Sequence, residues 1–429
     1  MMLVFCLVCL ILVPLSAAGL ALIHQGLGRS RSAAHAMIGA LCAAGIAAIV
    51  FVAFGFAFAG YAGGPSHILS VAGLRWDWLG AGTRFPSGAG LGPNDPAGYY
   101  RALVLCLEMS AAGLAAIIPL SGGADRWRLG ASCVASAVLA GFLFPLFAHW
   151  VWGGGWLNQL GANFGLTSFV DAGGAGVVQV IGGFMAVSVV WITGPRRGKF
   201  GADGMPAAIP GHNIVQVLFG CLLALVGWIA LESAASILFY QAGPEKVVWI
   251  IVNATLAASS GCLAALVVTR ARYRKPDASL TANGWVAGLV AGSASCGLVS
   301  PMAAIFIGVV AGGLVTYMIE VAELRLQADD PGGSVSVHAG AGIWGLIALG
   351  IFGNFPDGSR GEHLAAQLVG VASLLGFMLP LIYGANLLID RFVRYRVDSD
   401  GDWQGMDIRE LGAGAYPEFV VHADEFAPR

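Results

Sequence analysis

The sequence predicts an all-α polytopic membrane protein with eleven transmembrane helices. Its 429 residues are 57% hydrophobic and only 11% charged, whereas about 25% of the residues in a soluble domain are charged. Most of the chain divides into runs of about 20 apolar residues, the length that crosses the hydrocarbon core of a bilayer. The 63 glycines fit the same class, because small residues let spanning helices pack closely.

The apolar runs predict spans at 1–24, 34–60, 99–120, 129–152, 171–194, 213–240, 247–269, 280–298, 302–324, 335–353 and 364–390. The first run is interpreted as a true span, with a cleaved signal peptide as the alternative, because no small-residue cleavage site follows it. A Gly- and Pro-rich outer loop is expected over 61–98. We expect residues 1–393 to form the transmembrane domain and residues 394–429 to form a polar cytoplasmic tail, ordered only where it docks.

Basic residues give the orientation. Fifteen Lys and Arg residues lie in one set of alternating loops and the start of the tail: Arg29, Arg31, Arg126, Arg128, Arg196, Arg197, Lys199, Arg270, Arg272, Arg274, Lys275, Arg325, Arg391, Arg394 and Arg396. The opposite set holds five: Arg75, Arg84, Arg101, Lys246 and Arg360. Because basic residues favour the cytoplasmic side, the N-terminus is expected outside and the C-terminus inside. A net charge of −2 gives no indication of a nucleic-acid partner.

Two related phrases predict an inverted five-helix repeat. Asp171-Ala-Gly-Gly and Asp330-Pro-Gly-Gly each begin a span, and Gln179 and His338 each follow at the eighth position after the Asp. The two spans are five apart and enter from opposite sides, a relation that places a transport site near the midplane in other transporters. We therefore predict that Gln179 and His338 face each other in a pore. A simple helix–helix hydrogen bond is the alternative for Gln179.

Two carboxylates interrupt apolar runs. Glu108 and Glu232 stand in LVLCLEMSA and GWIALESAAS without an obvious partner. Each is either a neutral acid bonded to a backbone carbonyl or a group beside a water-filled path, where it attracts a cation or passes a proton. The sequence alone leaves both alternatives open.

Three further residues are expected at span boundaries. Asp171 stands where a carboxylate can cap the free N–H groups of a helix start, and Asp330 is expected to play the same structural role in the other half. Trp152 falls at the outer boundary of its span, either as an interfacial anchor or as a wall for a cation.

Several motifs together resemble those of the ammonium transporter (Amt/Mep/Rh) family. They are FAHWVWGGG (147–155), GHNIVQVLFG (211–220), GWIALESAAS (227–236), DDPGGSVSVHAGAGIWG (329–345) and the ending GMDI…GAGAY (405–416). The resemblance implies eleven helices in two pseudo-twofold halves and a homotrimer with one pore per subunit. In such pores an aromatic wall and a hydroxyl recruit the cation, two stacked phenylalanines form a gate, and two histidines face each other.

Matched by position, the resemblance assigns Trp152 to the vestibule, Asp171 to the position below it, and His338 to the second histidine. Gln179 replaces the first histidine. The other departures from the family pattern are Ala111 and Leu231 at the two phenylalanines, Ala235 at the vestibule hydroxyl, Glu108 where glutamine is usual and Glu232 where asparagine is usual. Glutamine does not titrate, so the two-histidine proton relay is expected to be broken.

The expected function is a membrane transporter or channel for ammonium or a related small amine, with altered selectivity. The alternatives are an ammonium or amine sensor acting through cytoplasmic partners, and a pore for a larger amine or a small neutral amide. No nucleophile–base pair or metal-ligand spacing indicates an enzyme, and no cofactor or metal is expected. The resemblance places the protein in the inner cell membrane, with the bilayer and a PII-type regulatory protein at the cytoplasmic face as partners.

Overall fold

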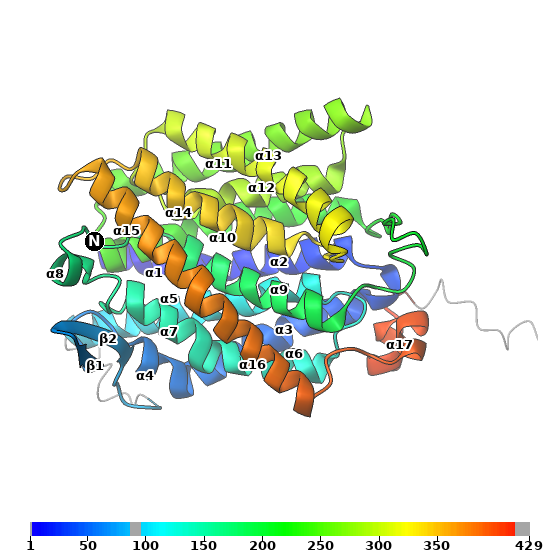
Figure 1. Cartoon of the computed structure of the whole chain (residues 1–429), viewed down its shortest axis with the longest axis horizontal. Coiled ribbons are helices and arrows are strands. Elements are labelled where there is room, and N and C mark those ends of the chain that lie inside the picture. The colour runs from blue at the N-terminus through cyan, green and yellow to red at the C-terminus, as the bar shows by residue number, and fades with distance from the viewer. Residues whose placement is uncertain (1, 86–95, 417–429) are drawn as a thin grey trace, which may run out of the picture.

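The computed structural model describes residues 2–85 and 96–416. Long helices run side by side along the longest axis of the molecule (Figure 1). Met1, part of the predicted outer loop (86–95) and the end of the predicted tail (417–429) lie outside the described residues.

The helices of the first half are α1 (Met2–Leu12), α2 (Pro14–Leu27), α3 (Ala33–Val50), α4 (Phe56–Ala59), α5 (Pro96–Gly122), α6 (Leu129–Val138), α7 (Phe144–Val151), α8 (Leu160–Phe164) and α9 (Ile181–Thr193). Those of the second half are α10 (Ile214–Tyr240), α11 (Pro244–Tyr273), α12 (Ala278–Ser293), α13 (Pro301–Leu326), α14 (Ala341–Phe352), α15 (Arg360–Ser373), α16 (Leu379–Phe392) and α17 (Ser399–Gln404). The described chain also has two strands, β1 (Ser66–Val71) and β2 (Leu74–Gly80), and short 3-10 and π-helical segments.

Within the described ranges, ten continuous helical segments are long and apolar enough to cross a membrane. They match ten of the eleven predicted spans: Met2–Leu27, Ser30–Ala59, Pro96–Gly122, Leu129–Val151, Ala175–Thr193, Ile214–Tyr240, Pro244–Tyr273, Pro301–Leu326, Val335–Phe352 and Arg360–Phe392. The remaining prediction, 280–298, corresponds to α12, which is helical for only 16 residues before a turn. The predicted all-helical membrane class is confirmed at this level.

Glycines set the closest helix contacts. A Cβ added to Gly227 of α10 would lie 1.9 Å from the backbone nitrogen of Ser16 in α2. A Cβ on Gly312 of α13 would lie 2.1 Å from the carbonyl oxygen of Gly261 in α11. Because lipid tails are as apolar as leucine, spanning helices gain stability from such close packing rather than from apolar burial. Part of the high glycine content therefore lies at helix crossings, where the missing side chain lets two backbones approach closely.

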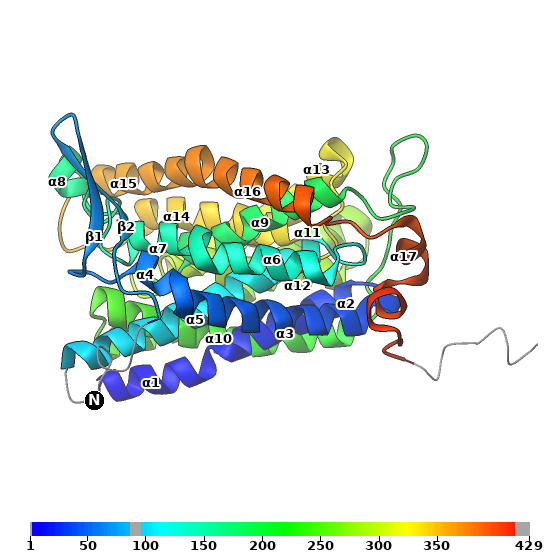
Figure 2. The same ribbon diagram turned by 90° about the horizontal axis from the view of Figure 1, so that it is seen from below.

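The expected outer loop contains a β-hairpin that the sequence analysis did not predict. Strands β1 and β2 pair antiparallel through a tight turn at Ala72 and Gly73, whose φ values of +52° and +79° are those a two-residue hairpin turn requires. Asp77 points inward, where its Oδ1 lies 2.9 Å from His149 Nε2. The hairpin therefore packs onto the end of α7 beside α8 (Figure 2).

The C-terminal tail docks at the end of the bundle opposite the hairpin (Figures 1 and 2). Arg31 Nη2 donates to the carbonyl oxygen of Asp402 at 2.9 Å, and the backbone N–H of His35 donates to Asp407 Oδ1 at 2.7 Å. The guanidinium of Arg197 lies 4.8 Å from the ring centre of Trp403. The described part of the tail is therefore ordered by contact with the loops that carry the predicted cytoplasmic basic residues.

A buried charge network fixes that same end. Arg196 Nε and Nη2 donate to the two carboxylate oxygens of Asp329 at 2.9 and 3.0 Å, and Arg196 Nη1 donates to Asp125 Oδ2 at 3.0 Å. Arg126 Nη2 donates to the carbonyl oxygen of Asp329 at 2.6 Å. Burial raises the pKa of Asp329, but Arg126 and Arg196 outweigh it and lower that pKa from 3.8 to about 2.

This network predicts acid-labile stability. The pKa of Asp329 in the folded protein lies below the value of about 3.9 in the unfolded chain. Ionised Asp329 therefore adds about 2 kcal/mol to the free energy of unfolding above about pH 3.9, and this contribution is lost as the pH falls toward 2. Unfolding midpoints in detergent measured from pH 6 to pH 2 should show this loss. Asp329→Asn should lower stability by about 3–5 kcal/mol, because two buried guanidinium groups lose their partner, and should flatten the acid limb. The exposed control Asp203→Asn should leave the loss of stability at low pH unchanged. If Asp329→Asn also leaves it unchanged, the assignment of this loss to Asp329 is contradicted.

Candidate functional site

The span that carries Gln179 begins with a π-helical segment, Ala175–Val180, and Asp171 lies just before it. The Asp171 carboxylate accepts four backbone N–H groups, from Gly174, Ala175, Gly176 and Val177, at 3.1, 2.7, 2.8 and 2.9 Å. Gly174 has a φ of +87°, a conformation that glycine adopts at little cost. The predicted helix cap at Asp171 is confirmed.

The span that carries His338 begins in a similar way. Asp330 Oδ2 accepts the N–H of Val335 at 2.7 Å, Gly333 has a φ of +69°, and Val335–Gly340 is again π-helical. π-Helical turns are rare and are frequent at functional sites. Both halves of the chain therefore present their central polar residue from the same unusual local structure.

Asp171→Ala is expected to destabilise the fold by about 3 kcal/mol. It leaves several buried N–H groups without an acceptor, and hydrogen bonds to a charged group contribute about 1.5–3 kcal/mol each. The melting temperature in detergent measures the effect. Asp398→Ala, which removes the cap of the peripheral helix α17, is the matched control and should cost about 1 kcal/mol. Equal losses in the two variants would show that the Asp171 cap is no more than a surface cap.

Gln179 and His338 meet in the interior. His338 Nδ1 donates to Gln179 Oε1 at 2.8 Å, and the two side chains are 2% exposed or less. With the proton on Nδ1, the neutral imidazole keeps Nε2 as an acceptor. Gln179 Nε2 has no hydrogen-bond partner among the described residues. The pair therefore offers one free acceptor, His338 Nε2, and one free amide donor group at Gln179 Nε2. The predicted contact between these two residues is confirmed.

A ring contact followed by two hydrogen bonds connects this pair to Glu232. The imidazole of His338 stacks on Trp228, with ring centres 6.5 Å apart. Trp228 Nε1 donates to Ser293 Oγ at 3.0 Å, and Ser293 Oγ lies 2.8 Å from Glu232 Oε1. The expectation that Glu232 lacks a partner is therefore wrong, because α12 brings a serine hydroxyl to it. Glu108 is fully buried and neither of its carboxylate oxygens bonds to a described residue.

Trp152 covers the start of the Gln179 span. Its Nε1 donates to the carbonyl oxygen of Asp171 at 2.9 Å, and its ring stacks on Phe239 with centres 4.8 Å apart and an interplanar angle of 15°. The indole is only 3% exposed. Phe239 covers one face of the ring, and the small exposed fraction shows that the other face is covered too, so a cation reaches the ring only if neighbouring groups move.

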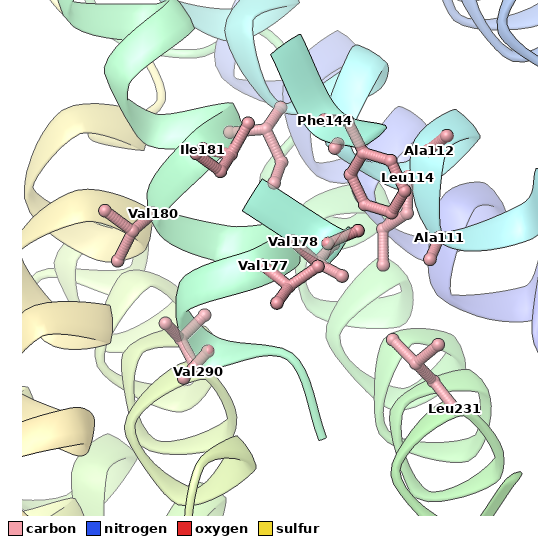
Figure 3. Close-up of a cluster of buried hydrophobic side chains, with 14 of the residues drawn as sticks. Ala111, Ala112, Leu114, Phe144, Val177, Val178, Val180, Ile181, Leu231 and Val290 are labelled. Atoms are coloured by element: carbon pink, nitrogen blue, oxygen red, sulfur yellow. The ribbon is translucent and has the colours of Figure 1, made fainter. Parts of the chain in front are cut away.

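An apolar layer fills the positions that the resemblance assigned to a phenylalanine gate. Ala111 of α5, Leu231 of α10 and Val178 lie in one cluster of buried side chains (Figure 3), and none of the three is exposed. Ala235, one turn beyond Leu231, is equally buried. Aliphatic packing therefore closes this layer in the structure, so a molecule can pass only if side chains move.

A cavity of about 340 Å³ lies at the tail end of the molecule, beside the start of the His338 span. Its wall includes Asp330, Asn283, Glu320, Glu323 and Lys199. Lys199 Nζ donates to Glu323 Oε1 at 2.6 Å. The cavity thus has a mixed lining that includes an ion pair, in contrast with the apolar layer near Trp152.

A model of the Ammonium Transporter Family matches residues 4–416. The chain belongs to the ammonium transporter family. The ammonium transporter Amt2 of Archaeoglobus fulgidus is 33% identical, over 98% of this chain and 89% of its own length. The ammonium transporter of Bacillus subtilis is 28% identical, over 97% of this chain and 98% of its own length. Both relatives are named as transporters.

Solved structures of the family share the fold. A structure named "Sensor Amt Protein" superposes with a TM-score of 0.85 at 26% identity, over 95% of this chain and 98% of its own. Candida albicans Mep2 superposes with a TM-score of 0.77 at 23% identity, over 93% and 86% of the two chains. The expectation from the motifs, that this is an ammonium-transporter-type membrane protein, is confirmed.

Several residues around the site were not predicted from the sequence. Phe239 stacks on Trp152, the hydroxyl of Tyr240 accepts the backbone N–H of Asp171 at 3.0 Å, and Trp228 and Ser293 connect His338 to Glu232. Trp228 stands in the GWIALESAAS segment, four residues before Glu232, and this spacing, which puts both residues on one helix face, was an available signal. The contacts of Ser293 and Phe239 join separate helices and had no local signal.

Proposed function

We propose that this member of the ammonium transporter family moves ammonium or a related small amine along a path from Trp152, through the apolar layer and past Gln179 and His338, to the polar cavity beside Asp330. The observation that carries the proposal is the 2.8 Å contact between His338 Nδ1 and Gln179 Oε1. Gln179 and His338 lie in the interior of the bundle, near the starts of two spanning helices, and polar side chains buried there are costly unless they serve a path or a ligand.

The free groups of this pair favour a selectivity different from that of a two-histidine pore. An ammonium ion has only donors, and the unpaired Gln179 amide N–H groups would repel it. Ammonia, methylamine or a small amide carries both an acceptor and a donor, so it matches Gln179 Nε2 and His338 Nε2 together. We infer that the path accepts the neutral form of an amine or a small neutral amide in place of or beside ammonium. Glu108 and Glu232 are proposed to attract the cationic form near the outer end.

The same proposal includes the membrane arrangement. It comprises eleven crossings, with α12 as the short one, and an inverted five-helix repeat. The positive-inside bias supports an outer N-terminus and a cytoplasmic tail from residue 394. The matching starts at Asp171 and Asp330 support the repeat. Exposed apolar side chains on α10, α11 and α13 supply lipid and subunit contacts, and we propose a homotrimer in the inner cell membrane. A PII-type protein is proposed to bind the docked tail and neighbouring loops.

Flux measurements test the proposal. The full chain in liposomes adsorbed on a solid-supported membrane should be given ammonium, methylammonium and a neutral amide in turn, with isotope uptake measured for the uncharged species. The proposal expects saturable uptake of at least one of them. Absence of both current and uptake for all three would contradict transport.

A second candidate is a sensor that binds an amine and signals through a cytoplasmic partner. Two observations favour it: the closed layer of Ala111, Leu231 and Val178, and the similarity to the structure named as a sensor. Saturable binding without flux in the same preparation would select this function over transport.

A further inference from the structure

A second cavity, of about 410 Å³, lies away from the proposed path at the hairpin end of the molecule. It lies between the β1–β2 hairpin, the turn after α7 and the bend between α15 and α16. Its wall is almost wholly apolar and includes Leu69, Trp76, Trp78, Trp150, Trp156 and Phe377. Nothing in the proposed transport path uses these residues.

Aromatic contacts make this wall a defined surface. Trp78 and Trp150 meet edge to face with ring centres 5.3 Å apart, and Trp150 lies 5.4 Å from the ring of Phe377. Trp150 Nε1 donates to the carbonyl oxygen of Trp78 at 2.9 Å. Packed aromatic pairs of this kind hold their geometry, so the cavity is a pre-formed feature of the hairpin and α7.

One lining residue carries a buried polar atom that lacks a partner. Trp156 is 7% exposed, and its indole Nε1–H has no acceptor among the described residues. Buried indole N–H groups usually find an acceptor. The lining therefore favours a mostly apolar ligand, and one acceptor oxygen on that ligand would satisfy the Trp156 N–H once the indole turns toward the cavity.

The cavity is continuous with the surface that lipid covers. Phe377 belongs to the span Arg360–Phe392, which crosses the outside of the bundle (Figure 1), and it is 43% exposed. Leu368 and Leu375 of the same span are also exposed, and Leu69 forms an exposed apolar edge on the hairpin. Tryptophan is enriched where a protein meets the membrane–water interface. These observations indicate that the ligand of this cavity is a membrane lipid.

We propose that this cavity binds one acyl chain of a phospholipid from the leaflet at the hairpin end, and that the Trp156 indole turns on binding so that an ester carbonyl oxygen accepts its N–H. The tryptophan wall contacts the chain, and the carbonyl sets its depth. The site is independent of the transported substrate, and it shares the α7 end with Trp152, which caps the proposed path.

Photo-crosslinking tests the proposal. The full chain in nanodiscs would be given a phosphatidylcholine with a diazirine on one acyl chain, and labelled peptides would be mapped by mass spectrometry. Labelling of residues 66–80 and 373–377 should be saturable and at least fivefold above that of other lipid-facing helices. Ser373→Trp, which fills the cavity, should reduce this labelling several-fold, whereas Leu375→Trp, an exposed position on the same span, should leave it unchanged.

A second variant separates binding from folding. Trp156→Phe keeps an aromatic ring and removes the N–H, and it should weaken retention of phospholipid through delipidation about tenfold in native mass spectrometry while the melting temperature stays unchanged. Non-saturable labelling spread evenly over all lipid-facing helices, or equal labelling in Ser373→Trp and Leu375→Trp, would overturn the proposal. Loss of substrate flux alone would bear on the transport path and not on this site.

Discussion

His338→Ala is expected to lower uptake of the transported amine about 10- to 100-fold. The substitution removes the free acceptor Nε2 and leaves Gln179 Oε1 buried without the donor that now lies 2.8 Å away. An unsatisfied buried polar group costs about 1–3 kcal/mol, and each 1.36 kcal/mol on a barrier changes a rate about tenfold. Initial rates of isotope uptake into proteoliposomes measure the loss.

The control for this variant is His67→Ala. His67 is an exposed imidazole on β1, at the hairpin end and outside the proposed path, so its removal should leave the uptake rate within a factor of about two. If His338→Ala transports at the unmodified rate while folding normally, the interior pair does not contact the substrate.

Gln179→His is expected to shift selectivity toward ammonium. A second imidazole next to His338 can accept and pass a proton, which glutamine cannot do, so ammonium-evoked current should rise about tenfold relative to uptake of a neutral amide. The loss of the free amide N–H group should also weaken amide uptake, because a site rejects a ligand whose hydrogen bonds it can no longer match. Solid-supported-membrane currents at several pH values measure both effects.

The same experiment extends to the apolar layer. Adding Ala111→Phe and Leu231→Phe to Gln179→His should further exclude substrates larger than ammonium, because two rings then occupy space now filled by small aliphatic side chains. A triple variant with the selectivity of the unmodified chain would show that neither the pair nor the layer determines which molecule passes.

Local patterns accounted for a large part of this structure. Ten of the predicted spans are continuous apolar helices because run length directly measures bilayer thickness. The Asp171 cap was predictable because an Asp beside a glycine turn at the start of a span can accept the free N–H groups of the helix start. The repeated phrases placed Gln179 and His338 together because equal offsets from equal caps give equal depths, and the 2.8 Å contact confirms that inference.

What the sequence could not supply depends on contacts between distant segments. The hairpin turn at Ala72–Gly73 lacked the Asn-Gly or Asp-Gly signal that marks such turns. The bond of Ser293 to Glu232 joins α12 to α10, and the ion pairs of Asp329 with Arg126 and Arg196 join three loops. Helix α12 is shorter than its apolar run because the chain turns after Ser293, and hydropathy does not register such a turn.

The central claim is that a substrate contacts the free nitrogens of the Gln179–His338 pair. Solid-state NMR on the 15N-histidine-labelled chain in bilayers tests it most directly, with His338 assigned among the eight histidines from the difference spectrum of His338→Gln. We predict that the transported amine or amide shifts the Nε2 resonance of His338, while Nδ1 keeps the shift of a donor bonded to Gln179. Saturable transport or binding with both His338 resonances unchanged would contradict the account.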